Sequence, residues 1–573
     1  MHNLKHEIAA HLAKGLEGVD AEQLVTLMEY PPNADMGDLS LPCFKLSKLL
    51  RKAPQVIAEE LKGLLASHDR IERVEAVSGY LNAFLKRDLF ATDVVRAVLT
   101  SGERYGSQTI GAGKTVVVDY SSPNIAKPFH IGHLRSTVIG GALKHIFRFL
   151  GYEVVGVNHL GDWGTQFGKL IVAYQKWGSA EQVESDGITE LLRLYVLFHD
   201  EADKQPELED EARAWFVKLE QGDEEANRLW RWFVDISLKE FQKIYGLLGS
   251  SFESYAGESF YIDKWSPIID ELRSKGLLEE DDGASIVRLD EYNMAPALML
   301  KKDGSSLYHT RDVAAAFYRK QTYQFDKCIY VTDYAQNLHF AQWFKIIELM
   351  GYEWSKDLLH VPFGRVSLEG AGLSTRKGNV IKLEELLTKA IEKSRDIIEE
   401  KNPGLANKEE VARQIGVGAI VFNDLSANRI KDIVFSWEDA LNFEGETGPY
   451  VQYAHARACS LLRKANGGAD ARYEPNAAGI DASSLLDDTS FAVLKELYLF
   501  QERIVQAMEK LEPSIISRYL VDLAQTFNRF YKECPILVED TNVREARLAL
   551  VASVRQTIQN GLALIGIQAP ERM

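Results

Sequence analysis

The sequence predicts an α/β protein built on a doubly wound parallel sheet, with an N-terminal α+β module and an all-helical C-terminal part. Between about residues 114 and 389, short apolar runs suited to buried strands alternate with longer helical patterns. Residues before about 110 combine amphipathic helical segments with one strand-like run. After about residue 402, apolar side chains recur at three- and four-residue spacing almost throughout.

Length and composition agree with a folded protein of several units. At 573 residues the chain exceeds what one hydrophobic core usually organises. Hydrophobic residues make up 46% and charged residues 26%, close to average globular usage, which excludes a disordered or collagen-like chain. There is neither a run of about 18 apolar residues nor a signal-peptide pattern. We therefore expect no membrane contact and a cytoplasmic location.

The charge balance and the cysteines exclude some kinds of site. The formal net charge of -17 argues against a polyanion as partner, so any contact with RNA needs a local basic patch. The four cysteines form no pair with zinc-ligand spacing and predict reduced structural thiols: Cys43, Cys328, Cys459 and Cys534.

The element pattern places the domain boundaries. Residues 1–110 form the first module, which ends in the strand-like run 80–85 and a Gly-rich joint at 106–113. Residues 111–395 form the α/β domain, whose predicted strands are 115–120, 153–157, 327–331 and 358–362. A charged helical pattern near 189–260 predicts an insertion into this domain. Residues 396–573 form the helical domain.

The strongest chemical signal is a strand, a polar loop and a helix start between residues 118 and 136. We expect the helix to begin near Ile131 and to end at Leu150, which places His130, Gly132 and His133 at its N-terminus. Backbone N–H groups there attract phosphate, and two imidazoles can donate hydrogen bonds as charge builds on an α-phosphate. The alternative, a metal half-site, needs a third ligand. The context favours nucleotide binding and adenylate formation.

A second, weaker signal is the small-polar and dibasic loop at residues 373–380. Ser374, Arg376 and Lys377 are also typical of a solvated turn. Together with the first motif, the loop is predicted to close over the pyrophosphate and to neutralise charge on the α-phosphate.

These motifs resemble those of class I aminoacyl-tRNA synthetases, whose HIGH motif stands here at residues 130–133 and whose KMSKS loop resembles 373–377. The strings at 121–127, 158–166, 445–457 and 569–573 resemble the arginyl-tRNA synthetase family in particular, and the resemblance spans essentially the whole chain. It implies a Rossmann-type catalytic core, an N-terminal module that contacts the tRNA D-loop, and a helical anticodon-binding domain.

The resemblance also implies a reaction and its partners. L-arginine and ATP would form arginyl-adenylate, and the arginyl group would pass to the terminal adenosine of tRNA(Arg), with tRNA needed for the first step to proceed well. Mg²⁺ would accompany ATP, and we expect no prosthetic group and no dedicated metal site. A monomer is expected from the family.

One departure from the family concerns a lysine. The loop lacks the first lysine of the KMSKS pattern, because Ala371 and Gly372 stand just before Leu373. In family members with an altered loop, a lysine just upstream of the HIGH motif is thought to compensate. Lys127 occupies that position here, and we predict that role for it.

A pocket for a guanidinium should offer carboxylates and polar acceptors in a fork-matching arrangement. Two stretches match the family's arginine contacts. The first follows the predicted strand 115–120, and the second is a predicted helix start together with one residue that follows the strand 327–331. Without the HIGH context, the second set is better explained as a helix-surface pair and a turn cap. The candidate residues are Asp119, Ser122, Pro123, Asn124, His133, Tyr308, Asp312 and Gln336.

Candidate tRNA contacts lie in two places. Aromatic and polar side chains interleave near the start of a C-terminal helix, as suits stacking on unpaired bases, although helical spacing equally indicates a buried stripe. Two residues of the N-terminal strand match family positions used on the D-loop, and strand alternation explains them equally well. The candidates are Tyr450, Gln452, Tyr453, Arg457, Tyr80 and Asn82.

Two other functions compete with this interpretation. A nucleotidyltransferase that makes a small adenylylated product would share the histidine motif but would need no tRNA domains, and the length of the chain counts against it. A tRNA-binding scaffold without catalysis would not need His130, His133 and Asp312.

Overall fold

The computed structural model describes residues 4–368, 382–468 and 472–573, which form two compact units. The first unit comprises Met1–Tyr105, Ala458–Leu499 and Gln525–Thr557. The second comprises Gly106–Arg457, Phe500–Ala524 and Ile558–Met573. Ser374, Arg376 and Lys377 lie outside the described residues.

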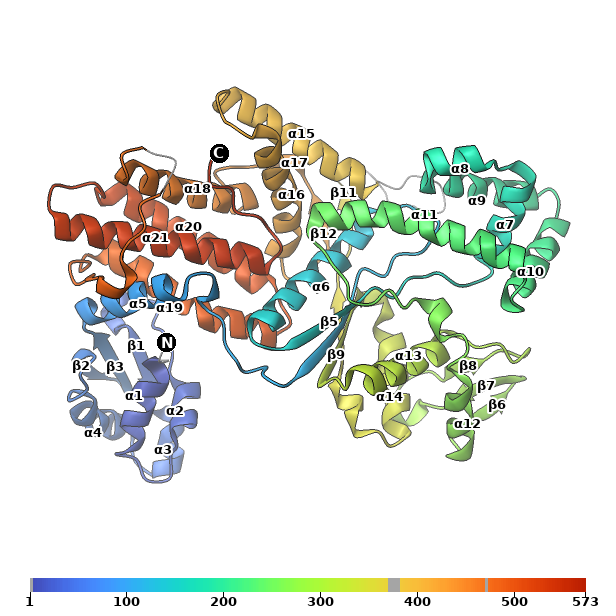
Figure 1. Ribbon diagram of the computed structural model, residues 1–573. Coiled ribbons are helices and arrows are strands. Elements are labelled where there is room, and N and C mark those ends of the chain that lie inside the picture. Colours follow the sequence, from blue (N-terminus) through green and yellow to red (C-terminus); the bar gives the residue numbers. More distant parts are fainter. Residues whose placement is uncertain (1–3, 369–381, 469–471) are drawn as a thin grey trace. The chain divides into compact units, whose positions relative to one another are not determined.

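A four-stranded parallel sheet forms the centre of the second unit (Figure 1). Its strands are β4 (Thr115–Asp119), β5 (Glu153–Val157), β9 (Lys327–Asp333) and β10 (Leu358–Phe363), in the order β10-β9-β4-β5. All three pairings are parallel. The four strands predicted from apolar runs are confirmed, because each run is long enough for a strand and too short for a helix.

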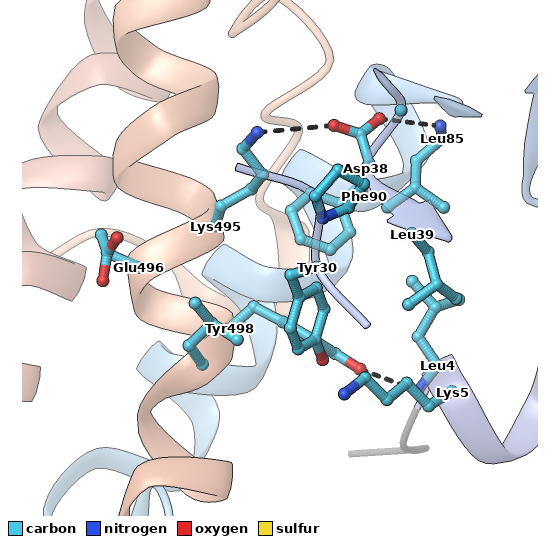
Figure 2. A pocket seen from close by; sticks show the side chains of 13 residues that line it. Leu4, Lys5, Tyr30, Asp38, Leu39, Leu85, Phe90, Lys495, Glu496 and Tyr498 are labelled. Carbon is cyan, nitrogen blue, oxygen red and sulfur yellow. Dashed lines mark hydrogen bonds and ion pairs between the residues drawn. The ribbon is translucent and has the colours of Figure 1, made fainter. Parts of the chain in front are cut away.

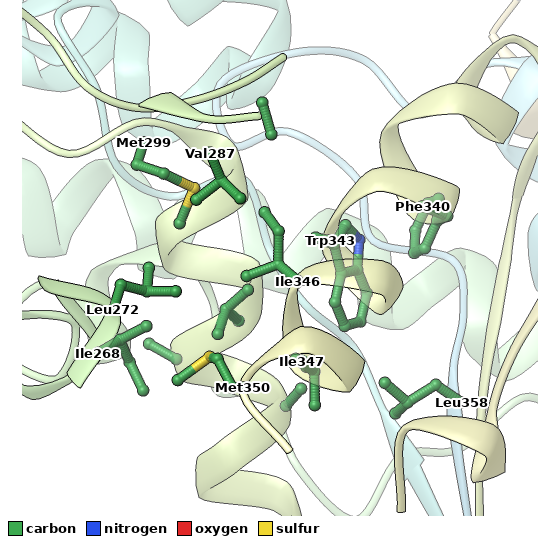
Figure 3. Packing of buried hydrophobic residues seen from close by; sticks show 14 of the residues in the cluster. Ile268, Leu272, Val287, Met299, Phe340, Trp343, Ile346, Ile347, Met350 and Leu358 are labelled. Carbon is green, nitrogen blue, oxygen red and sulfur yellow. The ribbon is translucent and has the colours of Figure 1, made fainter. Parts of the chain in front are cut away.

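Three helices of this unit carry or directly follow some of the candidate residues. They are α6 (Ile131–Phe149), α13 (Tyr308–Tyr323) and α14 (Asn337–Leu349). The start predicted for α6 is confirmed, and Gly151 ends it with a positive φ of 88°. The apolar face of α14 packs into the hydrophobic core shown in Figure 3. Within that core, Trp343, Ile346 and Ile347 are fully buried.

Consecutive helices follow β5 and run through the stretch near 189–260 where the sequence predicts an insertion. They are α7 (Gln166–Trp177), α8 (Ala180–Asp186), α9 (Ile188–Ala202), α10 (Glu207–Glu220) and α11 (Glu224–Leu248). After α12 (Ser266–Ser274), a small antiparallel sheet that the sequence did not predict is formed by β6 (Glu279–Asp281), β7 (Ala284–Val287) and β8 (Ala297–Leu300). Its first strand is Glu-Glu-Asp and exposed, so it has no apolar alternation to reveal it.

The C-terminal part is helical, as predicted. Its helices are α15 (Leu383–Lys401), α16 (Lys408–Ser426), α17 (Trp437–Ala440), α18 (Gly448–Ala465), α19 (Asp488–Glu509), α20 (Ser514–Glu533) and α21 (Thr541–Leu564). The short strand β12 (Ile433–Phe435) interrupts them and pairs in parallel with β11 (Val366–Leu368).

The N-terminal module has the predicted α+β composition. Strands β1 (Leu39–Pro42), β2 (Ile71–Val77) and β3 (Tyr80–Leu85) form an antiparallel sheet in the order β1-β3-β2. Helices α1 (Leu4–Ala13), α2 (Ala21–Leu27), α3 (Phe44–Leu50), α4 (Pro54–Leu65) and α5 (Arg87–Ser101) complete the module.

The first unit encloses a cavity of about 190 Å³ between the N-terminal module and α19 (Figure 2). Lys5 Nζ lies 3.9 Å from the centroid of the Tyr30 ring, and Lys495 Nζ lies 3.5 Å from Asp38 Oδ1. None of the residues for which the sequence predicts chemistry lines this cavity.

Two negative expectations can be compared with the described residues. All four cysteines are buried, and none of the four is in a disulfide bond. In the part of the chain that the structure describes, no helix combines the length and the apolar character needed to cross a bilayer.

Candidate active site

The N-terminus of α6 is capped by the two predicted histidines. His130 Nδ1 accepts a hydrogen bond of 3.0 Å from the N–H of Gly132, and His133 Nδ1 accepts one of 3.1 Å from the N–H of His130. This reciprocal arrangement is a capping box made of imidazoles. Gly132 is needed because a Cβ there would lie 2.8 Å from the His130 ring.

The caps fix the chemical state of both rings. Because each Nδ1 accepts a backbone hydrogen bond, a neutral ring carries its proton on Nε2. Burial and the charge of Lys127 lower the pKa of His130, and burial, His130 and Lys127 lower the pKa of His133 well below its ordinary value. Both rings are therefore neutral at pH 7, and each keeps an Nε2–H donor for a ligand.

The loop between β4 and α6 has an unusual backbone held by buried polar groups. Ser121, Ser122 and Ala126 have φ values of 72°, 48° and 59°, which L-residues rarely adopt. Ser121 Oγ lies 2.8 Å from Tyr245 OH, and Asn158 Oδ1 accepts a hydrogen bond of 3.1 Å from the N–H of Ser122. Backbone strain of this kind is typical of functional sites.

Further along the same loop, Pro123 and Asn124 pack against the segment that follows β5. Pro123 O accepts a hydrogen bond of 3.1 Å from the N–H of Gly161. A Cβ at Gly161 would lie 2.2 Å from Asn124 Oδ1, so the glycine makes room for this exposed amide. The sequence had no signal for this close approach.

Lys127 and Lys382 both lie near the capped helix end. Lys127 is exposed, and its Nζ lies 6.0 Å from the centroid of the Tyr195 ring. Lys382 is the first described residue after 369–381, and it forms a β-bridge with His130. The N–H of the next residue, Leu383, donates to Phe129 O at 2.9 Å. Lys382 and Leu383 are therefore fixed beside the start of α6.

Asp119, at the end of β4, is paired inside the protein. Its Oδ2 lies 2.8 Å from Arg319 Nη1, and its Oδ1 accepts a hydrogen bond of 2.9 Å from Ser122 Oγ. The Arg319 side chain is fully buried. The sequence missed this arginine because a cation in an amphipathic helical pattern is normally assigned to the solvent face.

The second group of predicted arginine contacts lies on α13 and at the start of α14. Tyr308 and Asp312 share a face of α13, and Tyr308 is 61% exposed. Gln336 is exposed at the N-cap position of α14 and makes no side-chain capping bond. His339 Nε2 lies 2.5 Å from Asp312 Oδ2.

A buried carboxylate that the sequence did not reveal lies beside this group. Arg311 Nη1 lies 3.4 Å from Glu258 Oε2. Burial raises the pKa of Glu258 to about 7, with Asp312 and Asp162 adding to the effect and Arg311 opposing it. A strongly shifted carboxyl among other charges is a frequent mark of a binding site. Glu258 begins a 3₁₀ helix of four residues, Glu258–Tyr261, which is too short to give a periodic signal.

His159 connects the two groups of arginine candidates. It is affected electrostatically by Asp119 and Arg319 on one side and by Asp312 and Asp162 on the other. The structure therefore brings the carboxyl end of β4 and the α13 helix together around one imidazole. The arrangement offers neutral donors for phosphate at α6 and several carboxylates for a cation at α13.

The candidate tRNA contacts separate into exposed and buried residues. Tyr453 is 41% exposed, and the Arg457 guanidinium carbon lies 4.8 Å from its ring centroid. Gln452 is fully buried and its amide donates to Gln414 O and Gln568 O, at 3.0 and 2.8 Å. This placement gives Gln452 a packing role in place of the expected contact with RNA. Tyr450 is half-buried.

The two N-terminal candidates differ in the same way. Tyr80 is 37% exposed and lies edge-on to Phe44, with ring centroids 5.2 Å apart. Asn82 is 7% exposed, and its Oδ1 accepts a hydrogen bond of 2.7 Å from Ser40 Oγ. Asn82 is therefore a packing residue of the sheet in this structure, and Tyr80 remains available to a ligand.

Comparison with known families matches three parts of the chain. The model of the class I tRNA synthetase (R) catalytic domain matches residues 94–437. The arginyl tRNA synthetase N-terminal domain matches residues 2–85, and the DALR anticodon binding domain matches residues 451–573.

Individual relatives match over the full length. The chain is 56% identical to an arginine–tRNA ligase of Alkaliphilus metalliredigens and 55% identical to one of Clostridioides difficile, in both cases over 100% of each chain. Among solved structures, the arginyl-tRNA synthetase of Thermus thermophilus superposes with a TM-score of 0.81 at 28% identity. It covers 100% of this chain and 99% of the other.

Proposed function

This chain belongs to the arginyl-tRNA synthetase family, and we propose the parts that its own residues take in the reaction of an arginine–tRNA ligase. L-arginine attacks the α-phosphate of ATP through a carboxylate oxygen, so that arginyl-adenylate forms and pyrophosphate leaves. The terminal adenosine of tRNA(Arg) then attacks the arginyl carbonyl carbon, and AMP leaves. Mg²⁺ enters with ATP, and the enzyme acts as a cytoplasmic monomer.

The capped end of α6 is the proposed phosphate site. His130 and His133 are neutral and keep Nε2–H donors, which suits them to bind oxygens of the α-phosphate as charge builds there. Lys127 supplies the positive charge that the altered loop lacks, since its ammonium is close enough to lower the pKa of both rings. Ser374, Arg376 and Lys377 would approach the pyrophosphate from the loop that ends at Lys382.

The arginine pocket is proposed between β4 and α13. The carboxylates of Asp312 and Glu258 face the substrate guanidinium, with Tyr308 and Gln336 as neutral partners. At the other end, Ser122, Pro123, Asn124 and His133 hold the backbone of the amino acid near the α-phosphate. Asp119 contributes indirectly, because it is paired with Arg319 and fixes the Ser122 hydroxyl.

The exposed aromatic residues are the proposed tRNA contacts. Tyr453 with Arg457 provides a ring and a cation for an unpaired base and its phosphate, and Tyr450 lies one turn earlier on α18. In the other unit, the exposed ring of Tyr80 suits a base of the D-loop.

The observation that carries this proposal is the pair of imidazoles that cap α6 directly after the strained loop. ATP–pyrophosphate exchange with arginine, measured with and without tRNA(Arg), tests it. Exchange that requires both arginine and tRNA is expected. Exchange independent of tRNA would favour a small-molecule nucleotidyltransferase, and its complete absence with bound tRNA would favour a non-catalytic scaffold.

A further inference from the structure

Asp312 is held by a chain of side chains that crosses between α13 and α14. Its Oδ2 lies 2.5 Å from His339 Nε2, and the other nitrogen of that ring, Nδ1, lies 3.2 Å from His309 Nε2. His309 Nε2 lies 3.0 Å from Gln342 Oε1, and Gln342 Nε2 donates to Ala295 O at 2.8 Å. The chain therefore alternates between the two helices and ends on a backbone carbonyl.

That carbonyl determines where the protons lie. Ala295 O can only accept, so it fixes the Gln342 amide with its NH₂ towards Ala295 and its oxygen towards His309. The Gln342 oxygen then needs a proton from His309 Nε2. Burial and the neighbouring His339 lower the pKa of His309 and outweigh the opposing effects of the Gln342 hydrogen bond, the Asp312 charge and the Leu298 carbonyl, so this ring is neutral at pH 7.

The position of the proton on His339 follows from its position on His309. With the proton on His309 Nε2, the facing His339 Nδ1 is an acceptor. The proton of His339 is then on Nε2, where it is donated to Asp312 Oδ2. Asp312 Oδ2 is consequently the acceptor of this hydrogen bond, and the other carboxylate oxygen is left for a ligand.

The backbone that carries this chain is rigid. Phe340, Trp343, Ile346 and Ile347 of α14 are buried in the core of Figure 3. His339 is half-buried and Gln342 is buried, and both stand on the same helix. Because that helix is packed into the core, the backbone of these two residues cannot shift without moving the core. Thr310, between His309 and Asp312 on α13, donates to Met299 O at 2.6 Å and is fully buried.

We propose that His339 is a positioning residue that aims the Asp312 carboxylate at the guanidinium of the substrate. The inference rests on the proposed function, because it assumes that Asp312 binds arginine. A guanidinium pairs best with a carboxylate whose plane is fixed, because its two parallel N–H groups require one orientation. An ammonium has three donors around a point charge and does not require that orientation. His339 therefore contributes to the preference for arginine over lysine.

The first test compares the Michaelis constants of two variants in aminoacylation. His339→Leu removes the donor, and we expect it to raise the KM for arginine about tenfold, with the KM values for ATP and tRNA within about twofold of wild type. His339→Gln keeps an N–H donor near the Nε2 position, and we expect it to restore the KM for arginine to within about threefold. Discrimination against lysine should fall about tenfold in His339→Leu.

A double-mutant cycle separates positioning from general packing. If His339 acts through Asp312, His339→Leu should change the KM for arginine little once Asp312→Asn is present. His360→Gln serves as the matched control, because His360 is another partly buried histidine, stacked on Phe340 of α14 at 4.3 Å and bonded to Thr332, outside this chain of bonds. It should leave the KM for arginine within about twofold.

The outcomes are distinguishable. If the wild-type enzyme charges tRNA with arginine and the KM for arginine is unchanged in His339→Leu, the positioning role is wrong and the proposed function is unaffected. Equal increases in the KM for arginine and ATP, or additive effects in the cycle, would overturn it as well. If His339→Leu fails to fold by thermal melting, His339→Asn takes its place. Its amide ends short of the Nε2 position, and the same arginine-specific increase is expected.

Discussion

Asp119 at the carboxyl end of β4 forms an ion pair with Arg319 of α13, with Oδ2 and Nη1 2.8 Å apart. The arginine side chain is 1% exposed and the aspartate side chain 10%. The negative charge at the end of the central strand is therefore balanced by a guanidinium of the protein itself. In the proposed pocket, the charge partners of a substrate guanidinium are therefore Asp312 and Glu258.

This pairing predicts a large effect of Asp119 on stability. Asp119→Asn should leave the buried Arg319 charge without a partner, and such a loss typically costs about 3–5 kcal/mol. The midpoint of thermal unfolding should fall accordingly. Arg319→Met should have a similar effect, because it isolates the carboxylate. The double variant Asp119→Asn/Arg319→Met should lose much less than the sum of the two, and strict additivity would contradict the pairing.

Lys127 is predicted to assist adenylate formation. Lys127→Ala should slow ATP–pyrophosphate exchange about tenfold, or about 1.4 kcal/mol, because the charge near the α-phosphate is lost. Lys356→Ala is the matched control, since Lys356 is also an exposed lysine of the second unit but stands in the segment before β10. An exchange rate of Lys127→Ala within about twofold of wild type would rule the role out.

Most of the fold could be predicted from the sequence, because each central strand is a short apolar run followed by a turn residue. Each long helix also keeps apolar residues at helical spacing. β4, β5 and β10 were found this way. The antiparallel sheet near residues 279–300 was not, because β6 consists of exposed acidic residues and β8 alternates only once.

Part of the candidate site could also be predicted from the sequence, but for a different reason. The histidines of α6 and Asp312 could be placed because their spacing and the family motifs are local in sequence. Glu258, His339 and Arg319 could not, because each acts through a partner far along the chain, and burial of a charge is a tertiary property. The same limit explains Gln452, which interleaved polar residues suggested as an RNA contact, and Asn82, which matches a family position used on the D-loop. The structure buries both side chains.

Glu258 predicts a pH dependence of arginine binding. Its pKa is about 7 in the free protein, so the carboxyl is mostly neutral at pH 6 and mostly ionised at pH 8. A cationic substrate favours the ionised form. The KM for arginine should therefore fall as pH rises from 6 to 8 and level off above, by about tenfold in total. The test is to measure the KM for arginine and the KM for ATP at each pH in the same buffers.

The control for this pH effect is Glu258→Gln, which removes the titrating group. Its KM for arginine should be higher than that of the wild type above pH 7 and nearly independent of pH between 6 and 8. The raised pKa also has a consequence for folding, because a carboxyl that is harder to ionise in the folded state disfavours the fold once it is ionised. Stability should therefore decrease as pH rises from about 4.5 to 7, and this slope should be absent in Glu258→Gln. A KM profile unchanged by the substitution would remove Glu258 from the pocket.

The exposed face of α18 predicts a separable contribution to tRNA binding. Tyr453→Ala and Arg457→Gln should both raise the KM for tRNA. Tyr453→Ala should leave the thermal midpoint nearly unchanged, because the Tyr453 side chain is exposed. Loss of a stacked base typically costs about 1–3 kcal/mol. If Arg457 contacts a phosphate, its loss should also reduce the slope of log affinity against log salt concentration by about 0.7, whereas Tyr453→Ala should leave that slope as it is.

Gln452 provides the contrast within the same helix. It is fully buried and donates to the backbone carbonyls of Gln414 and Gln568. Gln452→Ala removes both of these part-buried hydrogen bonds, and each is worth about 0.5–1.5 kcal/mol. The thermal midpoint should therefore fall, while the salt slope of tRNA binding stays at the wild-type value because no phosphate contact is lost. The opposite pattern, with a stable Gln452→Ala variant and a reduced slope, would mean that this side chain turns outward to the RNA. The assignment of α18 into a packing face and a binding face would then have to be reversed.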